Sequence, residues 1–121
     1  MEKPLIMICE DDEEILQIYE VILMDHDYHV ITESNSLLLF ELLKKTIPDL
    51  LILNLRMPYL SGDRIAYLLT SHDKYASIPI LMISADIRVQ EVVKDLQLKD
   101  YLLKPFDIDV LVQTVNRFFP K

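Results

Sequence analysis

Short runs of apolar residues alternate along the chain with segments in which apolar residues recur at helical spacing. The runs are continuous and partly β-branched, which is typical of strands that are covered on both faces of a sheet. Five segments have this pattern: Leu5–Cys9, Tyr28–Ile31, Leu50–Leu53, Ile80–Ile83 and Tyr101–Leu103. We predict a strand at each of them.

The segments between these runs predict helices, because apolar residues three, four and seven positions apart form a stripe on one side of a helix. The stripes are Ile15, Ile18, Tyr19 and Ile22; Leu38, Leu42 and Leu43; Ile65, Leu68 and Leu69; Val89, Val92, Val93 and Leu96; and Ile108, Leu111, Val112 and Val115. Asp107 is the expected N-cap of the last helix. Glu13 and Glu14 would complement the positive end of the first helix.

Five strands, each followed by a helix, predict an α/β fold with a (βα)5 doubly wound parallel sheet. Right-handed crossover connections place the helices on both faces of such a sheet. A chain of 121 residues has the length of one domain and can bury a core without disulfides or metals. We therefore expect a single domain over residues 1–121.

The composition excludes several classes of protein. The lone Gly62 excludes the glycine-rich GxGxxG motif and the P-loop. The single Cys9 excludes a disulfide framework and a CxxC motif, and we expect it to be a buried, reduced thiol. The net charge of -8, from 12 Lys+Arg and 20 Asp+Glu, argues against a basic surface that binds nucleic acid.

The apolar runs also bear on the location of the protein. None approaches the about 18 apolar residues that a membrane-spanning helix needs. The N-terminus, Met-Glu-Lys-Pro, lacks the charged and apolar regions of a signal peptide. We therefore expect a cytoplasmic protein without a membrane partner.

Polar side chains follow four of the predicted strands: Glu10–Glu14, Asn54, Ser84 and Lys104. Each alone has an ordinary explanation, such as helix capping, turn formation or solvation. The carboxyl ends of parallel strands meet at one edge of a sheet, however, and ligands bind there. Adjacent carboxylates favour a hard divalent cation, and lysine and serine can contact phosphoryl oxygens. The conjunction predicts a site for a metal ion and a phosphoryl group.

Four segments together resemble the response-regulator receiver domain of two-component signalling: Met7–Ile15, Pro48–Pro58, Ile80–Ala85 and Asp100–Phe106. The resemblance covers the whole chain in the family's order and spacing. It implies a flavodoxin-like sheet with strand order 2-1-3-4-5. It also implies phosphorelay signalling, with Mg²⁺ as cofactor and a histidine kinase or phosphotransferase protein as the upstream partner.

The resemblance further implies roles for individual residues. Glu10 and Asp11 match the family's acidic pair, in which Asp11 would bind Mg²⁺ directly and Glu10 mainly through water. The backbone carbonyl of Arg56 would be a further metal ligand. Ser84 matches the residue that follows the phosphoryl group on activation, and Lys104 matches the lysine that pairs with it.

Asn54 stands where the family has the phosphoacceptor aspartate. A neutral amide oxygen is a weak nucleophile, so we expect ordinary phosphorylation to fail. The amide has almost the shape of the carboxylate, so the fold should be kept, while the lost charge should relax the pocket and weaken Mg²⁺ binding. Two explanations stay open: a natural pseudo-receiver that signals by protein interaction alone, or an aspartate changed to asparagine in the laboratory.

The resemblance also bears on the surface through which the protein would signal. Tyr101 matches the aromatic residue whose rotamer reports the switch, although a half-buried strand residue would look the same. Leu98 and Lys99 replace the family's usual Gly-Ala, so we expect a less tight turn before the last strand. The fourth helix, fifth strand and fifth helix would form the partner face.

No output domain is expected after Phe119, so we interpret the chain as a stand-alone receiver or one excised from a longer protein. The downstream target is unknown. Without a phosphoryl group, we expect a monomer or a weak homodimer that has no catalytic activity of its own.

Two other classes of protein compete with this interpretation, the first of which has the same topology. A flavodoxin-like electron carrier needs a loop rich in Ser, Thr and Gly for the FMN phosphate, whereas the acidic Glu10–Glu14 would repel it. A phosphatase or phosphotransferase with an acidic nucleophile, which would be Asp11 or Asp12, needs a DxD pair that this segment lacks. Both are less consistent with the sequence than a receiver.

Overall fold

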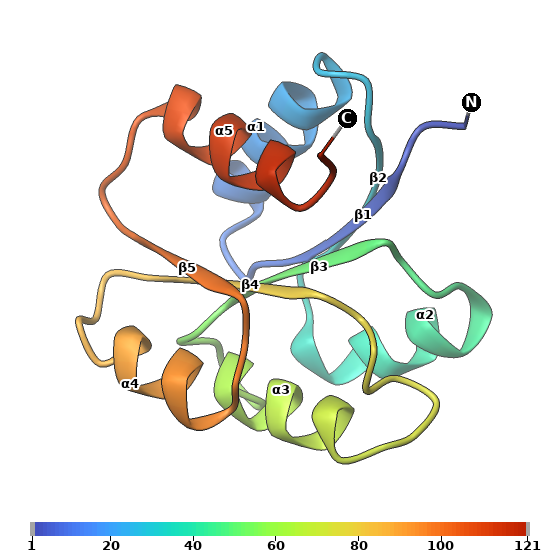
Figure 1. Cartoon of the computed structure of the whole chain (residues 1–121), viewed down its shortest axis with the longest axis vertical. Helices are drawn as coiled ribbons and strands as arrows, with labels where there is room; N and C mark the ends of the chain where they lie inside the picture. Colours follow the sequence, from blue (N-terminus) through green and yellow to red (C-terminus); the bar gives the residue numbers. More distant parts are fainter. Residues whose placement is uncertain (1, 121) are drawn as a thin grey trace.

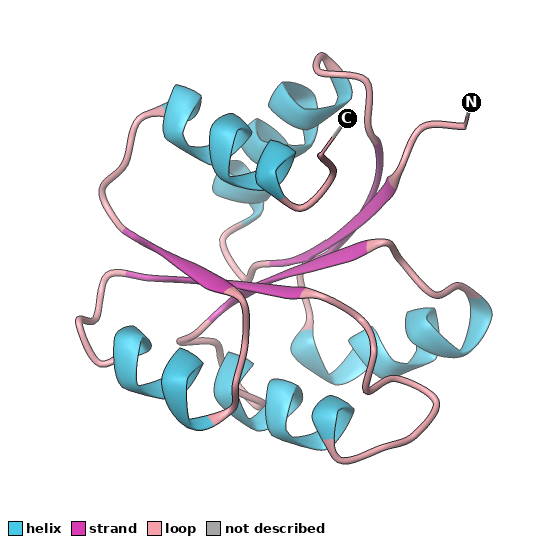
Figure 2. Ribbon diagram, viewed as in Figure 1, coloured by secondary structure: helices cyan, strands magenta, loops and turns pink. Residues whose placement is uncertain are grey.

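The computed structural model describes residues 2–120, which form a parallel sheet between two layers of helices (Figures 1 and 2). The strands are β1 (Leu5–Cys9), β2 (His29–Glu33), β3 (Leu50–Asn54), β4 (Ile80–Ser84) and β5 (Asp100–Leu103). All four neighbouring pairs are parallel, in the order β2-β1-β3-β4-β5. The predicted doubly wound sheet and its strand order are confirmed.

One helix follows each strand, as the apolar stripes predicted. The helices are α1 (Glu13–Met24), α2 (Leu39–Lys45), α3 (Gly62–Thr70), α4 (Val89–Asp95) and α5 (Ile108–Arg117), and a short 3-10 helix, η1 (Ser36–Leu38), precedes α2. Figure 1 shows α1 and α5 on one face of the sheet and α2, α3 and α4 on the other. In residues 2–120, no helix is long and apolar enough to cross a membrane.

The sheet separates two hydrophobic cores. The central strands β3 and β4 are buried along their whole length, because helices cover both of their faces. Alternate residues serve the two sides: Leu51 and Leu53 pack towards α2, α3 and α4, whereas Leu50 and Ile52 pack towards α1 and α5. The edge strands β2 and β5 are mostly half-buried. The strand predicted at Tyr28–Ile31 extends two residues further in the structure, since its pairing with β1 continues to Glu33.

Several stripe residues of the predicted helices do not face the core. The exposed ones are Ile18 at 52%, Leu38 at 49%, Leu68 at 40% and Ile108 at 54%. In α1 the buried residues are Leu16, Tyr19 and Leu23, of which only Tyr19 belongs to the predicted stripe. Apolar residues occur nearly all round this helix, so spacing alone could not select the buried face.

The turn between α4 and β5 is closed by two hydrogen bonds, contrary to the looser turn expected at Leu98 and Lys99. The Leu98 N–H donates to the Val93 carbonyl at 2.9 Å, and the Gln97 N–H donates to the Lys94 carbonyl at 3.2 Å. This pair of hydrogen bonds is a common way for a helix to end. It places one residue in the left-handed conformation, and glycine is preferred at that position. Here Gln97 adopts the left-handed conformation, with φ of 56°.

Gln97→Gly is therefore expected to stabilise the protein. Glycine removes the cost of the left-handed backbone, which exceeds the entropy that glycine adds to the unfolded chain, so the free energy of unfolding should rise by about 0.5–1 kcal/mol. Urea unfolding followed by circular dichroism measures the change. The control is Gln113→Gly, at an exposed position inside α5, which should lose about 1 kcal/mol. A loss in both variants would contradict the argument.

Candidate functional site

The carboxyl ends of the strands bring together side chains from distant parts of the chain. Asn54 is the last residue of β3, Glu10 directly follows β1, and Lys104 directly follows β5. The parallel register holds these ends level, since Cys9 pairs with Leu53 and the next residue of β3 pairs with β4. The convergence that the sequence predicted at this edge is observed for Glu10, Asp11, Asn54 and Lys104.

The Asn54 side chain lies at the centre of a hydrogen-bonded group. Its Nδ2 atom donates to Oε2 of Glu10 at 3.0 Å and to Oδ1 of Asp11 at 3.2 Å. The same atom also donates to the backbone carbonyl of Arg56 at 2.9 Å. On the other side, Lys104 Nζ lies 3.4 Å from Asn54 Oδ1. Both polar atoms of this buried amide therefore have partners, and these partners fix which way it points.

Glu10 is the most buried charged residue of the group, with 2% of its surface exposed. Burial is the main cause that raises the pKa of Glu10, and its contact with Asp11 raises it further. Lys104 acts in the opposite direction, through an ion pair of 3.1 Å between Nζ and Glu10 Oε1. One lysine thus compensates a crowded pair of acidic side chains.

The acidic segment after β1 also contains the start of α1. Oδ1 of Asp12 accepts from the backbone N–H groups of Glu14 at 3.0 Å and Ile15 at 3.2 Å, so it caps the helix. Glu13 and Glu14 lie in the first turn, as predicted. Asp107 occupies the predicted N-cap position of α5, but its side chain makes no capping hydrogen bond.

Ser84 is buried at the end of β4, but its hydroxyl is engaged outside the Asn54 group. Its Oγ accepts from the backbone N–H of Asp86 at 3.0 Å. The Asp86 carboxylate is bound by Arg88 and Arg56, and these hydrogen bonds hold the pKa of Asp86 well below its usual range. Within residues 2–120, the structure therefore does not bring the Ser84 hydroxyl to Asn54. Asp86 lies in a loop without periodic spacing, so the sequence pattern gave no signal for it.

Gly62 is a second residue whose role the sequence analysis missed. Its N–H donates to the Leu55 carbonyl at 2.8 Å and folds the loop after β3 back onto the strand end. A Cβ atom at this position would lie 2.4 Å from the backbone carbonyl oxygen of Asn54. The only glycine of the chain is thus needed for space, beside the residue at the centre of the site. In the sequence, the signal for this role was that the chain has no other glycine.

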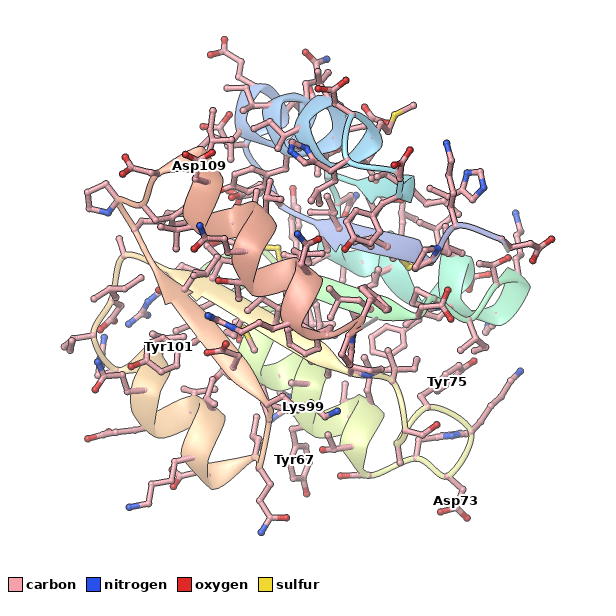
Figure 3. The ribbon with its side chains drawn as sticks, turned by 45° about the horizontal axis from the view of Figure 1, so that its top comes forward. Tyr67, Asp73, Tyr75, Lys99, Tyr101 and Asp109 are labelled. Carbon is pink, nitrogen blue, oxygen red and sulfur yellow. The ribbon has the colours of Figure 1, made fainter. Side chains whose placement is uncertain are left out.

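Two other predicted residues lie on β1 and β5. Tyr101 is half-buried and packs against the core that includes Val89 and Val93 of α4, and Figure 3 shows it on this side of β5. Its role as a switch stays a prediction. Cys9 is fully buried and free, as expected, and burial is the main cause that raises its pKa to about 12. Its thiol is therefore protonated at neutral pH.

The oxygen atoms around Asn54 are of the kind that bind Mg²⁺, since two carboxylates and a carbonyl are hard ligands. In this arrangement, however, the N–H groups of Asn54 point at Glu10, Asp11 and the Arg56 carbonyl. No group of three or more His, Cys, Asp or Glu side chains in residues 2–120 could hold a metal ion. As these residues are arranged here, the Asn54 amino group engages the oxygen atoms of Glu10, Asp11 and Arg56 that a divalent cation would contact.

Comparisons with known proteins agree on one family. The sequence model of the response regulator receiver domain matches residues 6–116. The sensor histidine kinase TmoS of Ectopseudomonas mendocina is 32% identical over 117 residues, which are 95% of this chain. A putative response regulator from Chloroflexus aurantiacus has a TM-score of 0.90 and 25% identity, with 97% of this chain and 98% of that chain covered. The response regulator TrrA of Thermotoga maritima, solved in complex with Mg(2+)-BeF, has a TM-score of 0.85 and 22% identity, with 98% and 100% covered.

The chain is short beside most of these curated relatives. It spans 12% of the length of TmoS, and 54% or less of the lengths of six further relatives. The likeness therefore concerns the segment that these longer proteins share with this chain.

Proposed function

The chain belongs to the response regulator receiver domain family, and from this premise we propose that it is a phosphorelay signalling module that does not accept a phosphoryl group at residue 54. The single observation that carries the proposal is Asn54, which lies at the end of β3 among Glu10, Asp11 and Lys104. Receiver domains are signalling modules, and we propose no enzymatic activity for this chain.

The chemistry of the amide supports this proposal. Transfer to a receiver requires a carboxylate oxygen that attacks phosphorus and forms an acyl phosphate. The side-chain oxygen of Asn54, Oδ1, is neutral. It lies within reach of the Lys104 ammonium group, which draws electron density away from this oxygen. Attack by this oxygen would also give an unstable imidate. Residue 54 therefore lacks the nucleophile that the reaction needs.

The remaining residues are proposed to keep the positions of the family's site. Lys104 already contacts both Glu10 and Asn54, as a lysine that pairs with a phosphoryl group would. Ser84 would reach the same place only after it gives up its bond with Asp86. Tyr101 is proposed as the aromatic switch residue, by resemblance.

Magnesium binding is proposed to be weak, in the millimolar range or above. Glu10, Asp11 and the Arg56 carbonyl are the ligands that we propose. The TrrA structure contains magnesium, but at 22% identity its likeness supports the fold alone. In this chain the proposed ligands include two carboxylates, and by resemblance to the family the neutral Asn54 stands where a third charged group would be.

The partners are proposed from the family. A histidine kinase or a phosphotransferase protein would act upstream, and a target that the sequence does not identify would act downstream. The face formed by α4, β5 and α5 is the proposed partner surface. With no phosphoryl group to change this face, we expect a monomer or a weak homodimer, and neither nucleic acid nor membrane as a partner.

A phosphorylation-independent interaction module is the second candidate function. It is favoured by the Asn54 amide, because both of its polar atoms already have protein partners. Such a module would present one fixed surface to its target.

The experiment that tests the proposed function is intact-mass measurement after incubation with acetyl phosphate and Mg²⁺. We expect no gain in mass, because the carboxylate nucleophile is absent. A stoichiometric gain of one phosphoryl group, located at residue 54 by peptide mapping, would overturn the proposal. A gain elsewhere would be distinguished by the same mapping and would leave residue 54 unmodified, as proposed.

A further inference from the structure

We propose that the Asn54 carboxamide replaces the divalent cation of the acidic pocket, so that the pocket is held together by the chain itself. This inference rests on the proposed function, since it assumes that the pocket is the family's metal site. It goes further by assigning Asn54 a positive role. The amide bridges the oxygen atoms that a cation would otherwise bridge.

The geometry of the amino group carries the proposal. Its Nδ2 atom lies 2.9–3.2 Å from three oxygen atoms, which belong to Glu10, Asp11 and the Arg56 carbonyl. These atoms come from two separate segments, the loop after β1 and the loop after β3. Two N–H groups serve three acceptors, so at least one hydrogen is shared. One small, positively polarised group thus joins both loops.

Lys104 fixes the amide in this orientation. Its Nζ atom lies 3.4 Å from Asn54 Oδ1 and 3.1 Å from Glu10 Oε1. A reversed amide would place its oxygen against the two carboxylates and its N–H groups against the ammonium group. Both changes would replace attraction with repulsion. The ammonium group also polarises the amide, which strengthens its N–H groups as donors.

The proposal makes a prediction that differs from the ordinary view of an asparagine in a metal site. If Asn54 supplies its oxygen as a metal ligand, then removal of the side chain weakens metal binding. If Asn54 instead competes with the cation for the same oxygen atoms, then removal of the side chain strengthens binding. The sign of the change in affinity decides between the two.

The experiment is a Mn²⁺ titration of the unchanged protein, Asn54→Ala and Asn54→Asp, with free Mn²⁺ measured by electron paramagnetic resonance. We expect Asn54→Ala to bind Mn²⁺ about tenfold more tightly than the unchanged protein, because the cation no longer displaces three hydrogen bonds to the amide. Circular dichroism establishes that each variant is folded. Equal or weaker binding by a folded Asn54→Ala variant would overturn the proposal.

A second measurement needs no substitution. In the ¹⁵N NMR spectrum of the unchanged protein, the side-chain N–H₂ hydrogens of Asn54 should exchange with water at least about tenfold more slowly than those of the exposed Asn116. Exchange as fast as that of Asn116 would contradict the proposal, even if Asn54→Ala failed to fold.

Asn54→Asp separates this inference from the proposed function. It restores a charged ligand, so we expect it to bind Mn²⁺ most tightly of the three proteins. If it binds no Mn²⁺, the pocket is not the family's metal site, and the proposal that Glu10, Asp11 and the Arg56 carbonyl bind magnesium fails. If it binds while Asn54→Ala binds more weakly than the unchanged protein, only the inference about the amide fails.

Discussion

In the Asn54→Asp variant, we expect one phosphoryl group to be added per chain during incubation with acetyl phosphate and Mg²⁺. Phosphoryl transfer in proteins depends mostly on positioning and on electrostatic stabilisation. Lys104 already lies within reach of residue 54, and the acidic pair lies on the other side of it. The nucleophile is the part that is missing, and the variant restores it.

Intact-mass spectrometry measures this gain, and treatment with hydroxylamine identifies its chemistry, because hydroxylamine cleaves an acyl phosphate. Asn54→Ala is the matched control, which changes the same position without supplying a carboxylate and should gain no mass. A variant with aspartate that stays unmodified would mean that the site lacks more than its nucleophile. The interaction-module function would then be favoured.

The same substitution should have a cost in stability when no metal is present. It removes three donated hydrogen bonds and adds a third negative charge beside Glu10 and Asp11. Like charges about 4 Å apart repel by up to about 4 kcal/mol at an effective dielectric constant of 20. We therefore expect the metal-free variant to unfold at a lower temperature, and added Mg²⁺ to recover part of the loss.

Gly62→Ala is expected to destabilise the protein by about 3 kcal/mol, at the upper end of what an added methyl group costs in a packed region. The new Cβ atom would lie 2.4 Å from the Asn54 carbonyl oxygen and 2.9 Å from Met82 Sδ. Met82 can move its flexible side chain, but the carbonyl belongs to the backbone of the central strand β3. Relief would require a shift of the strand end that carries the site.

Urea unfolding followed by circular dichroism measures this loss. Ser61→Ala is the neighbouring control. It also ends in an alanine side chain but adds no atom, and it removes only the hydrogen bond from the Ser61 hydroxyl to Asp63. Its effect should stay below about 1 kcal/mol. Equal stability of Gly62→Ala and the unchanged protein would show that the loop can move away from β3 freely.

The sequence was sufficient to predict where the site lies, but not which hydrogen bonds its side chains form. Asn54 ends β3, and Glu10 and Lys104 directly follow β1 and β5. A parallel sheet brings these positions to one edge whichever side chains they carry. The direction of the Asn54 amide depends instead on the groups around it: an acceptor in Glu10, 44 positions away, and a donor in Lys104, 50 positions away. No local pattern contains that information.

Two further differences have local causes. Ser84 was predicted to face the site, but its hydroxyl accepts from the N–H of Asp86, whose carboxylate is in turn bound by Arg56 from the loop after β3 and by the nearby Arg88. In α1, apolar residues occur on more than one side, so the periodicity was compatible with burial of Ile18 as well as of Leu16. Packing against the sheet, which is not local, decided between them.

The hydrogen bonds of Asn54 also bear on the order in which the protein folds. Glu10 and Lys104 are separated by 94 positions in the chain and meet only across the assembled sheet. No strand and helix that are adjacent in sequence contain all members of the group, and a nascent chain that ends before Lys104 contains none of its positive charge. The group is therefore complete only once β5 has docked beside β4, so we expect the contacts of Lys104 to form later than those between the loops after β1 and β3.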